Sequence, residues 1–282
     1  MTEAPLAAAL AMLGSAMLHA VMGLLTKRAA DKLVFRGVMQ GVSTLITLPI
    51  LLLNPLPGWE VWRFLLMGAV IHYVFQMALI SAYERGDMSL VYPVMRGAAP
   101  ALAAVAAFAF LGETLGPIEI AGLAIASAAV AGFGWPDKGG APKAAALAFA
   151  LVAGAMTALY SVNDAAGARA AGSPFVYLAW FFVTTAIPLN LTAILRRGAR
   201  WPGLVRQELR FGAVSSVFGA GSYALALYAL SIAPVAEMAA LRETSVVFGA
   251  ILAALVLKEP FGARRTALAV TMAAGLVLLQ AA

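Results

Sequence analysis

Long apolar runs, separated only by short polar gaps, constrain this chain more than any other feature of its sequence. A helix that spans a membrane needs about 20 consecutive apolar residues, and the first such run extends from Leu6 to Thr26. A membrane-spanning strand would need only about 10 residues with strict alternation of apolar and polar side chains, which these runs lack. The sequence therefore predicts an all-α polytopic membrane protein.

Ten candidate spans result when a window of about 19 residues is moved along the sequence. They cover residues 5–26, 34–53, 62–82, 88–111, 116–134, 142–164, 174–195, 208–230, 235–257 and 264–281. Charged residues make up only 11% of the chain, against about 25% in soluble domains, so the bilayer must be the solvent for most of the surface. The first run lacks the basic start of a secretory signal, and we expect it to be a retained helix.

The two halves of the sequence resemble each other. Residues 95–116 align without a gap with residues 241–262 at an offset of 146, and Arg96 then falls on Arg242. A glutamate and a glycine further along coincide as well. We therefore divide the chain into a first repeat in residues 1–135, a linker in residues 136–143 and a second repeat in residues 144–282.

Each repeat holds five spans, and an odd number forces the second repeat to enter the membrane from the opposite side. This predicts two inverted five-helix repeats. The cations of the gaps are distributed unevenly: 15 lysines and arginines, Arg36 among them, fall on one side, and only Arg63 and Arg169 fall on the other. The first side is expected to be cytoplasmic, with the chain in the inner (plasma) membrane.

The sequence offers no motif for enzymatic chemistry. It has no cysteine, which excludes disulfides and cysteine-ligated metals. It also lacks a nucleophile elbow, a zinc-binding H-E-x-x-H and a phosphate-binding loop. The net charge of +6 is scattered over short gaps and forms no basic domain for nucleic acid. We expect neither an enzyme nor a cofactor or metal, and any transport would draw its energy from an ion gradient or from the gradient of the solute.

Several segments resemble the EamA-type permeases of the drug/metabolite transporter superfamily. They are LGETLG at 111–116, LKEPFG at 257–262, AYERGDMSLVYPVMRGAAP at 82–100, ALYSVNDAAG at 158–167 and APVAEMAALRETSVVFGAIL at 233–252. The resemblance implies a ten-helix carrier with a central cavity between its halves, which works by alternating access and exports metabolites or amino acids. In such permeases the first helix often reads His-Ala-x-x-Asn before a lysine. His19 and Lys27 match this pattern, whereas Gly23 stands where such permeases often have an asparagine.

Arg96 and Arg242 are the first candidates for a substrate site. Each lies about eight residues into its span, where an arginine costs about 2.5 to 3.5 kcal/mol on insertion scales and must be paired, hydrated or functional. They could bind an anionic group of the substrate, or they could bind backbone carbonyls where a helix is interrupted. Both interpretations remain open at this stage.

Two acidic residues could receive protons or an amine. Glu243 directly follows Arg242, and the two point about 100 degrees apart on a helix, so each needs another partner. Asp164, at the end of its expected span, is the obvious candidate among the acids for the partner of the arginine. An alternative is that Asp164 is merely hydrated at the interface.

Both histidines of the chain fall inside spans and could carry protons. His72 shares a helix face with Gln76, and His19 lies in the first span. Either histidine could instead be an interhelical hydrogen-bond donor. We add four tyrosines to the expected cavity lining because they supply apolar surface and a hydroxyl: Tyr83, Tyr92, Tyr160 and Tyr223.

Together these features predict a secondary-active transporter of a small polar or amphipathic metabolite. The combination of cationic and acidic residues favours an exporter of amino-acid-like zwitterions or organic anions, with protons as the candidate coupling ion. The alternative is proton-coupled efflux of lipophilic cations, which would need a carboxylate that dominates the cavity. Ten helices in two complementary halves suffice for a monomer.

Overall fold

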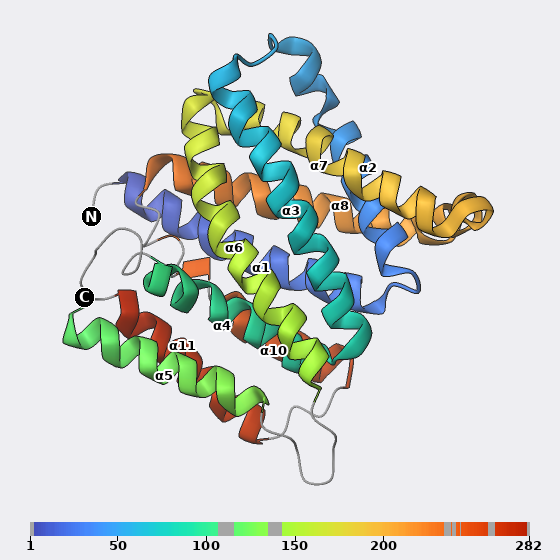
Figure 1. Cartoon of the computed structure of the whole chain (residues 1–282). Coiled ribbons are helices and arrows are strands. Elements are labelled where there is room, and N and C mark those ends of the chain that lie inside the picture. The colour runs from blue at the N-terminus through green and yellow to red at the C-terminus, as the bar shows by residue number, and fades with distance from the viewer. Residues whose placement is uncertain are drawn as a thin grey trace.

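The structure is a computed structural model that describes residues 3–106, 116–134, 143–233, 238, 241–242, 244–258 and 263–280. All regular secondary structure in these ranges is helical (Figure 1). The helices are α1 (Glu3–Arg28), α2 (Lys32–Leu53), α3 (Trp59–Arg85), α4 (Met88–Ala106), α5 (Pro117–Gly134), α6 (Ala144–Ala170), α7 (Pro174–Arg197), the short 3₁₀ helix η2 (Gly198–Arg200), α8 (Trp201–Ile232), α10 (Ser245–Val256) and α11 (Ala263–Gln280).

Each of the ten expected spans overlaps one of these α-helices. Five helical stretches in the described ranges are long and apolar enough to cross a membrane, and the last of them joins α7 to α8. Two shorter apolar helices, Ile120–Ala129 and Thr266–Gly275, lie within α5 and α11. The chain is thus a helical, multi-pass membrane protein, while the number of crossings remains a prediction.

The connection between the seventh and eighth spans is shorter than predicted. The predicted spans 174–195 and 208–230 leave residues 196–207 between them, but only η2 separates α7 from α8, which begins at Trp201. Pro202 lies in the first turn of α8, where its missing N–H is not needed and its fixed φ favours a helix. The polar residues of this stretch therefore belong to the end of α7 and the first turns of α8, and they do not form a long loop.

The sixth span also extends beyond its predicted end. Asp164 was expected to terminate it, but α6 continues to Ala170 through residues that are compatible with a helix. The Asp164 side chain is 1% exposed and points into the protein. Its carboxylate is therefore a buried group of the helix interior, and the interpretation of Asp164 as a hydrated interfacial residue is wrong.

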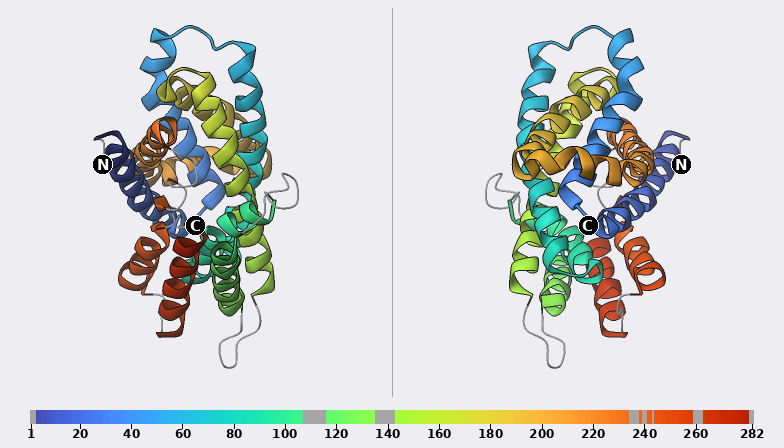
Figure 2. Two further views of the ribbon diagram at one scale, coloured as in Figure 1. Left: turned by 90° about the vertical axis from the view of Figure 1, so that its left-hand side faces the viewer. Right: turned by 90° about the vertical axis from the view of Figure 1, so that its right-hand side faces the viewer.

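Helices that are far apart in sequence pack as antiparallel pairs. Helix α1 lies against α8, where the Ser15 hydroxyl donates to the carbonyl of Ser222 over 2.7 Å. Helix α2 lies against α7, where the Asn190 amide donates to the carbonyl of Gly37 over 3.0 Å. Helices α5 and α11 run side by side at the lower edge of the molecule (Figures 1 and 2). Glycines allow these approaches, because a Cβ at Gly275 would lie 2.7 Å from the backbone nitrogen of Ala126.

Several of the cations predicted to be cytoplasmic make contacts between helix ends. Arg197 pairs with Asp31 over 2.6 Å, and Lys143 pairs with Asp87 over 2.6 Å. Arg28 donates to the carbonyl of Val256 over 3.0 Å. We call Arg28, Asp31, Asp87, Lys143 and Arg197 together the basic end. Both chain termini lie on one side in Figure 1.

Candidate functional site

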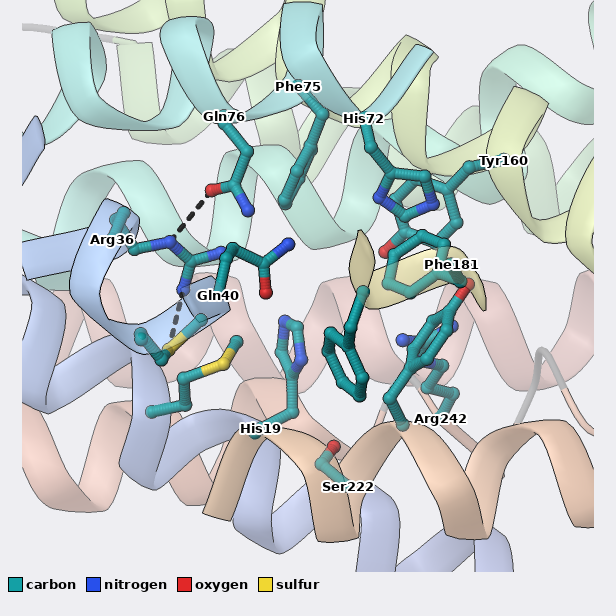
Figure 3. A pocket seen from close by; sticks show the side chains of 15 residues that line it. His19, Arg36, Gln40, His72, Phe75, Gln76, Tyr160, Phe181, Ser222 and Arg242 are labelled. Carbon is teal, nitrogen blue, oxygen red and sulfur yellow. Dashed lines mark hydrogen bonds between the residues drawn. The ribbon is translucent and has the colours of Figure 1, made fainter. Parts of the chain in front are cut away.

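A cavity of about 50 Å³ lies at the centre of the helix bundle (Figure 3). Its walls come from α1, α2, α3, α6, α7 and α8, together with Arg242 just before α10. Its charged and hydrogen-bonding lining includes His19, Arg36, Gln40, Gln76, Ser222 and Arg242. Since a single water occupies roughly 10 to 15 Å³ by this measure, the space holds only a few waters. A metabolite could enter only if the walls move apart.

Arg36 is a lining residue that the sequence analysis missed. It was counted among the cations of the gaps, but it lies one turn into α2 and is 2% exposed. Its Nε donates to Oε1 of Gln76 over 2.7 Å, and one terminal nitrogen lies 3.4 Å from the hydroxyl of Thr26. All its hydrogen-bond partners in the described ranges are neutral. The signal that could have revealed it is its place four residues after Lys32, inside the apolar run.

Arg242 lines the opposite end of the cavity. Its guanidinium carbon lies 5.7 Å from the centre of the Tyr160 ring, over the ring face. Its Nε has no hydrogen-bond partner among the described residues. A buried guanidinium with unused donors is able to bind an anion. Arg242 is thus placed as expected for substrate binding, a role that remains a prediction.

Arg96 behaves differently from Arg242, although the two occupy equivalent positions in the repeats. Its Nε donates to Oγ of Ser245 over 3.0 Å, and a terminal nitrogen donates to the carbonyl of Arg242 over 2.9 Å. Arg96 is not among the residues that line the described cavity. This is the geometry of the second interpretation, in which the arginine binds a backbone carbonyl near the start of a helix.

Asp164 is surrounded by hydrogen-bond donors. Its Oδ1 accepts from the hydroxyl of Tyr177 over 2.8 Å and from the amide of Asn163 over 3.0 Å. Its Oδ2 lies 2.7 Å from Nε2 of His72 and accepts from the hydroxyl of Tyr223. We call these five residues the Asp164 cluster. The expected pairing of Asp164 with an arginine is wrong, because neutral donors and a histidine occupy both oxygens.

His72 connects the Asp164 cluster with the cavity. One nitrogen contacts Asp164, while the ring stacks on Tyr160 with centroids 4.3 Å apart and meets Phe181 edge-on at 4.6 Å. The ring of Tyr223 stacks on Phe181 at 4.5 Å. The cavity thus has an aromatic wall beside Arg242. Gln76, one turn along α3, lines the same cavity, as its shared face with His72 predicted.

His19 lies between the two lining arginines in Figure 3. It is 8% exposed, and its ring centroid lies 6.4 Å from that of Tyr92. The charged side chains of the described lining are those of Arg36 and Arg242, and both are cationic.

Tyr83 and Tyr92 do not line the described cavity. Both are 1% exposed and pack around Gly23 of α1, where a Cβ would meet Tyr92 at 3.2 Å and the Tyr83 hydroxyl at 3.3 Å. Gly23, which departs from the resemblance, thus makes room for two tyrosines. Glu243 lies outside the described residues.

Comparison with known sequences identifies the family of this multi-pass membrane protein. The EamA-like transporter family matches it twice, over residues 6–135 and 144–280. The chain belongs to the EamA-like transporter family. No curated protein matches the sequence.

A solved structure described only as "Crystal structure of protein" is similar in fold. It aligns with a TM-score of 0.65 and 18% sequence identity over 96% of this chain and 95% of the other. At this identity the similarity concerns the fold alone. The fold and the family together define a membrane transporter of the drug/metabolite superfamily.

Proposed function

We propose that this protein is a secondary-active transporter of small organic anions, including amino-acid-like zwitterions. It works by alternating access of two inverted five-helix halves, residues 1–135 and 144–282, as an exporter in the plasma membrane. The single observation that carries the choice of substrate is the charge of the cavity. Arg36 and Arg242 both line it; among the described residues Arg36 has only neutral hydrogen-bond partners, and the Nε of Arg242 has none.

The pattern of helix contacts supports the two inverted halves. With α6, α7, α8, α10 and α11 taken as the repeats of α1 to α5, three pairs join equivalent helices: α2 with α7, α4 with α10 and α5 with α11. Other contacts occur in matched sets, since α3 packs on α6 as α8 packs on α1, and α4 packs on α6 as α10 packs on α1. A two-fold rotation that exchanges the halves produces this pattern.

The direction of the paired helices supports an axis in the membrane plane. In the α2 and α7 pair, Asp31 meets Arg197 and Gln40 donates to Thr185 over 2.9 Å, so the two helices are antiparallel. A two-fold axis that exchanges antiparallel helices lies perpendicular to them. If the helices cross the bilayer, that axis lies in its plane.

The basic end supports alternating access. The ion pair of Asp31 with Arg197 joins the first half to the second, and the pair of Asp87 with Lys143 joins the first half to the last residue of the linker. Moving the second half and the linker away from the first half at this end would require both pairs to separate. Because they are partly exposed, water can replace them at a small cost of about 0 to 1 kcal/mol each. Such contacts suit a closure that forms and breaks in every cycle.

His72 and Asp164 support coupling to protons. His72 lines the cavity and touches the buried Asp164 carboxylate over 2.7 Å, so a proton on this pair has direct access to the site. The titratable groups around the pair are Tyr160 of α6, Tyr177 of α7 and Tyr223 of α8. The role of His19 is then to donate to the substrate.

The same charges argue against efflux of lipophilic cations. That function needs a carboxylate free to receive the cation, whereas both oxygens of Asp164 are engaged by the Asp164 cluster. No carboxylate is among the described lining residues. Arginines at two ends of the cavity would repel a cation.

Binding and transport by the purified protein test this proposal. A ligand that binds only the folded form raises the melting temperature, so carboxylates and amino acids should do so, and quaternary amines should not. In proteoliposomes, Arg242→Gln should lower uptake of the bound solute roughly ten- to a hundredfold, which corresponds to the loss of a charge-assisted hydrogen bond. Arg210→Gln, at an exposed position of α8, is the matched control. Transport of quaternary amines alone would refute the proposal.

A further inference from the structure

We infer that the cavity binds a dianion, with one acidic group at Arg36 and the other at Arg242, as in a dicarboxylate. The inference rests on the proposed function and narrows its substrate class. It begins with the positions of the two arginines, which lie at opposite ends of the cavity in Figure 3. His19 lies between them in this view.

Among the described residues, no acidic side chain pairs with either of the two guanidinium groups. Arg36 contacts the amide of Gln76, the hydroxyl of Thr26 and the sulfur of Met39, which are all neutral. Arg242 faces the ring of Tyr160 and has an Nε without a partner among the described residues. A buried charge without an opposite partner is costly, and an anion at each position removes that cost.

The carboxylate of Asp164 does not supply the missing charges. It contacts the His72 ring and has donors on both oxygens from Tyr177, Asn163, Tyr223 and His72. The described site therefore holds an excess of positive charge that one monoanion does not balance.

The space between the arginines suits a carbon spacer. His19, Phe75 and Phe181 contribute ring surface along the cavity. A carboxylate binds a guanidinium through two parallel hydrogen bonds, so an acidic group at each end leaves the spacer against these rings. A zwitterion would place its ammonium group in this positive region, where no described lining residue is an acid. A phosphate monoester would concentrate both charges at one end.

The two arginines belong to different halves of the chain, so a dianion bound to both would also connect the halves. Arg36 lies in the first repeat and Arg242 in the second. A solute that binds both at once joins the halves through itself, whereas a monoanion engages only one of them. Closure around the substrate would then depend on the second acidic group.

The decisive experiment compares dicarboxylates with monocarboxylates of equal length on the full chain. Malonate, succinate, glutarate and adipate are matched with propionate, butyrate, valerate and hexanoate in thermal shift and in proteoliposome uptake. We expect one dicarboxylate length to bind at least roughly tenfold more tightly than its monocarboxylate, as one further charge-assisted contact provides. Arg36→Gln and Arg242→Gln should each abolish this advantage. Arg210→Gln should preserve it.

Two further variants and a check of folding separate a loss of charge from a loss of structure. Arg36→Lys and Arg242→Lys keep the charge and should retain part of the preference, and gel filtration with helical circular dichroism checks that each variant is folded. Equal binding of mono- and dicarboxylates at every length would overturn the inference, as would tighter binding of glycerol phosphate or inorganic phosphate than of any dicarboxylate. If monocarboxylates or amino acids are carried without such a preference, only this inference fails. If no organic anion is carried, the proposed function fails as well.

Discussion

Arg242 lies over the Tyr160 ring, and Asp164 contacts the His72 ring that stacks on Tyr160. The charges of Asp164 and of the lining arginines nevertheless have opposite surroundings. Asp164 has hydrogen-bond donors on both oxygens, supplied by side chains from α3, α6, α7 and α8. Arg242 has a buried Nε without a partner in the described ranges, and Arg36 has neutral partners only. A buried charge whose hydrogen-bond partners all come from the protein holds helices together, whereas a buried charge without a counterion is available to bind a ligand.

The largest effect on stability is expected at Asp164. In Asp164→Ala the hydroxyls of Tyr177 and Tyr223 and the ring nitrogen of His72 lose their shared acceptor inside the protein. Breaking such a buried network should lower the free energy of unfolding by about 3 to 5 kcal/mol. Thermal unfolding in detergent measures the loss.

Ser161→Ala is the matched control for that experiment, since Ser161 lies on the same helix and its hydroxyl donates to the carbonyl of Thr157 over 2.8 Å, its one hydrogen bond in the described ranges. It should melt close to the unchanged protein. An Asp164→Ala protein with unaltered stability would break the comparison, because the cluster would then not hold the helices together.

A smaller and opposite effect is expected at Arg242. Arg242→Gln removes a buried charge whose Nε has no partner among the described residues, so it should change the free energy of unfolding by less than about 1 kcal/mol, or raise it. The same melting curves measure this change. A loss as large as that of Asp164→Ala would show that Arg242 is structural, and would weaken its assignment to the substrate.

The smallest effects compare one glycine beside each region. A Cβ at Gly68 of α3 would lie 3.1 Å from the Asn163 amide and 3.3 Å from Asp164, so Gly68→Ala must displace the Asp164 cluster. A Cβ at Gly219 of α8 would meet the sulfur of Met22 at 3.2 Å, and methionine adapts easily. Gly219→Ala should gain up to about 1 kcal/mol from helix propensity, and Gly68→Ala should be at least about 1 kcal/mol less stable than Gly219→Ala.

Gly41→Ala calibrates this pair, because nothing lies within 4 Å of a Cβ at that position and only helix propensity changes. Melting temperatures of the three variants provide the ranking. If Gly68→Ala were as stable as Gly41→Ala, the Asp164 cluster would be looser than its contacts indicate.

Local patterns in the sequence predicted the helices and part of the lining. His72 and Gln76 are four residues apart, so they share a face, and both line the cavity. The predicted lining tyrosines fall into two groups, those that line the cavity and those that do not, and their spacing in the sequence does not predict this division. Tyr160 and Tyr223 reach the cavity, whereas Tyr92 packs between Gly23 of α1 and Gly249 of α10.

Arg36 and Tyr177 were not predicted as site residues, because their roles depend on contacts with other helices. Arg36 looked like a topology signal because it follows Lys32 near the start of a span, yet Gln76 of α3 covers it. Tyr177 lies at the start of α7, where nothing in its own segment indicates that it donates to Asp164. Asp164 itself was expected to meet an arginine, and it meets His72, 92 residues away.

The sequence by itself determined that this chain forms apolar helices in a membrane, since that follows from the length of its apolar runs. It also determined that the halves repeat, since residues 95–116 align with residues 241–262 and Arg96 falls on Arg242. Only the tertiary structure decided which charges meet. The rotation of each helix about its axis is set by close contacts such as that between Ser15 and Ser222, which are 207 residues apart. Those rotations brought donors to Asp164 and left Arg36 and Arg242 facing a common cavity, an outcome that no local pattern encodes because it depends on all the helices at once.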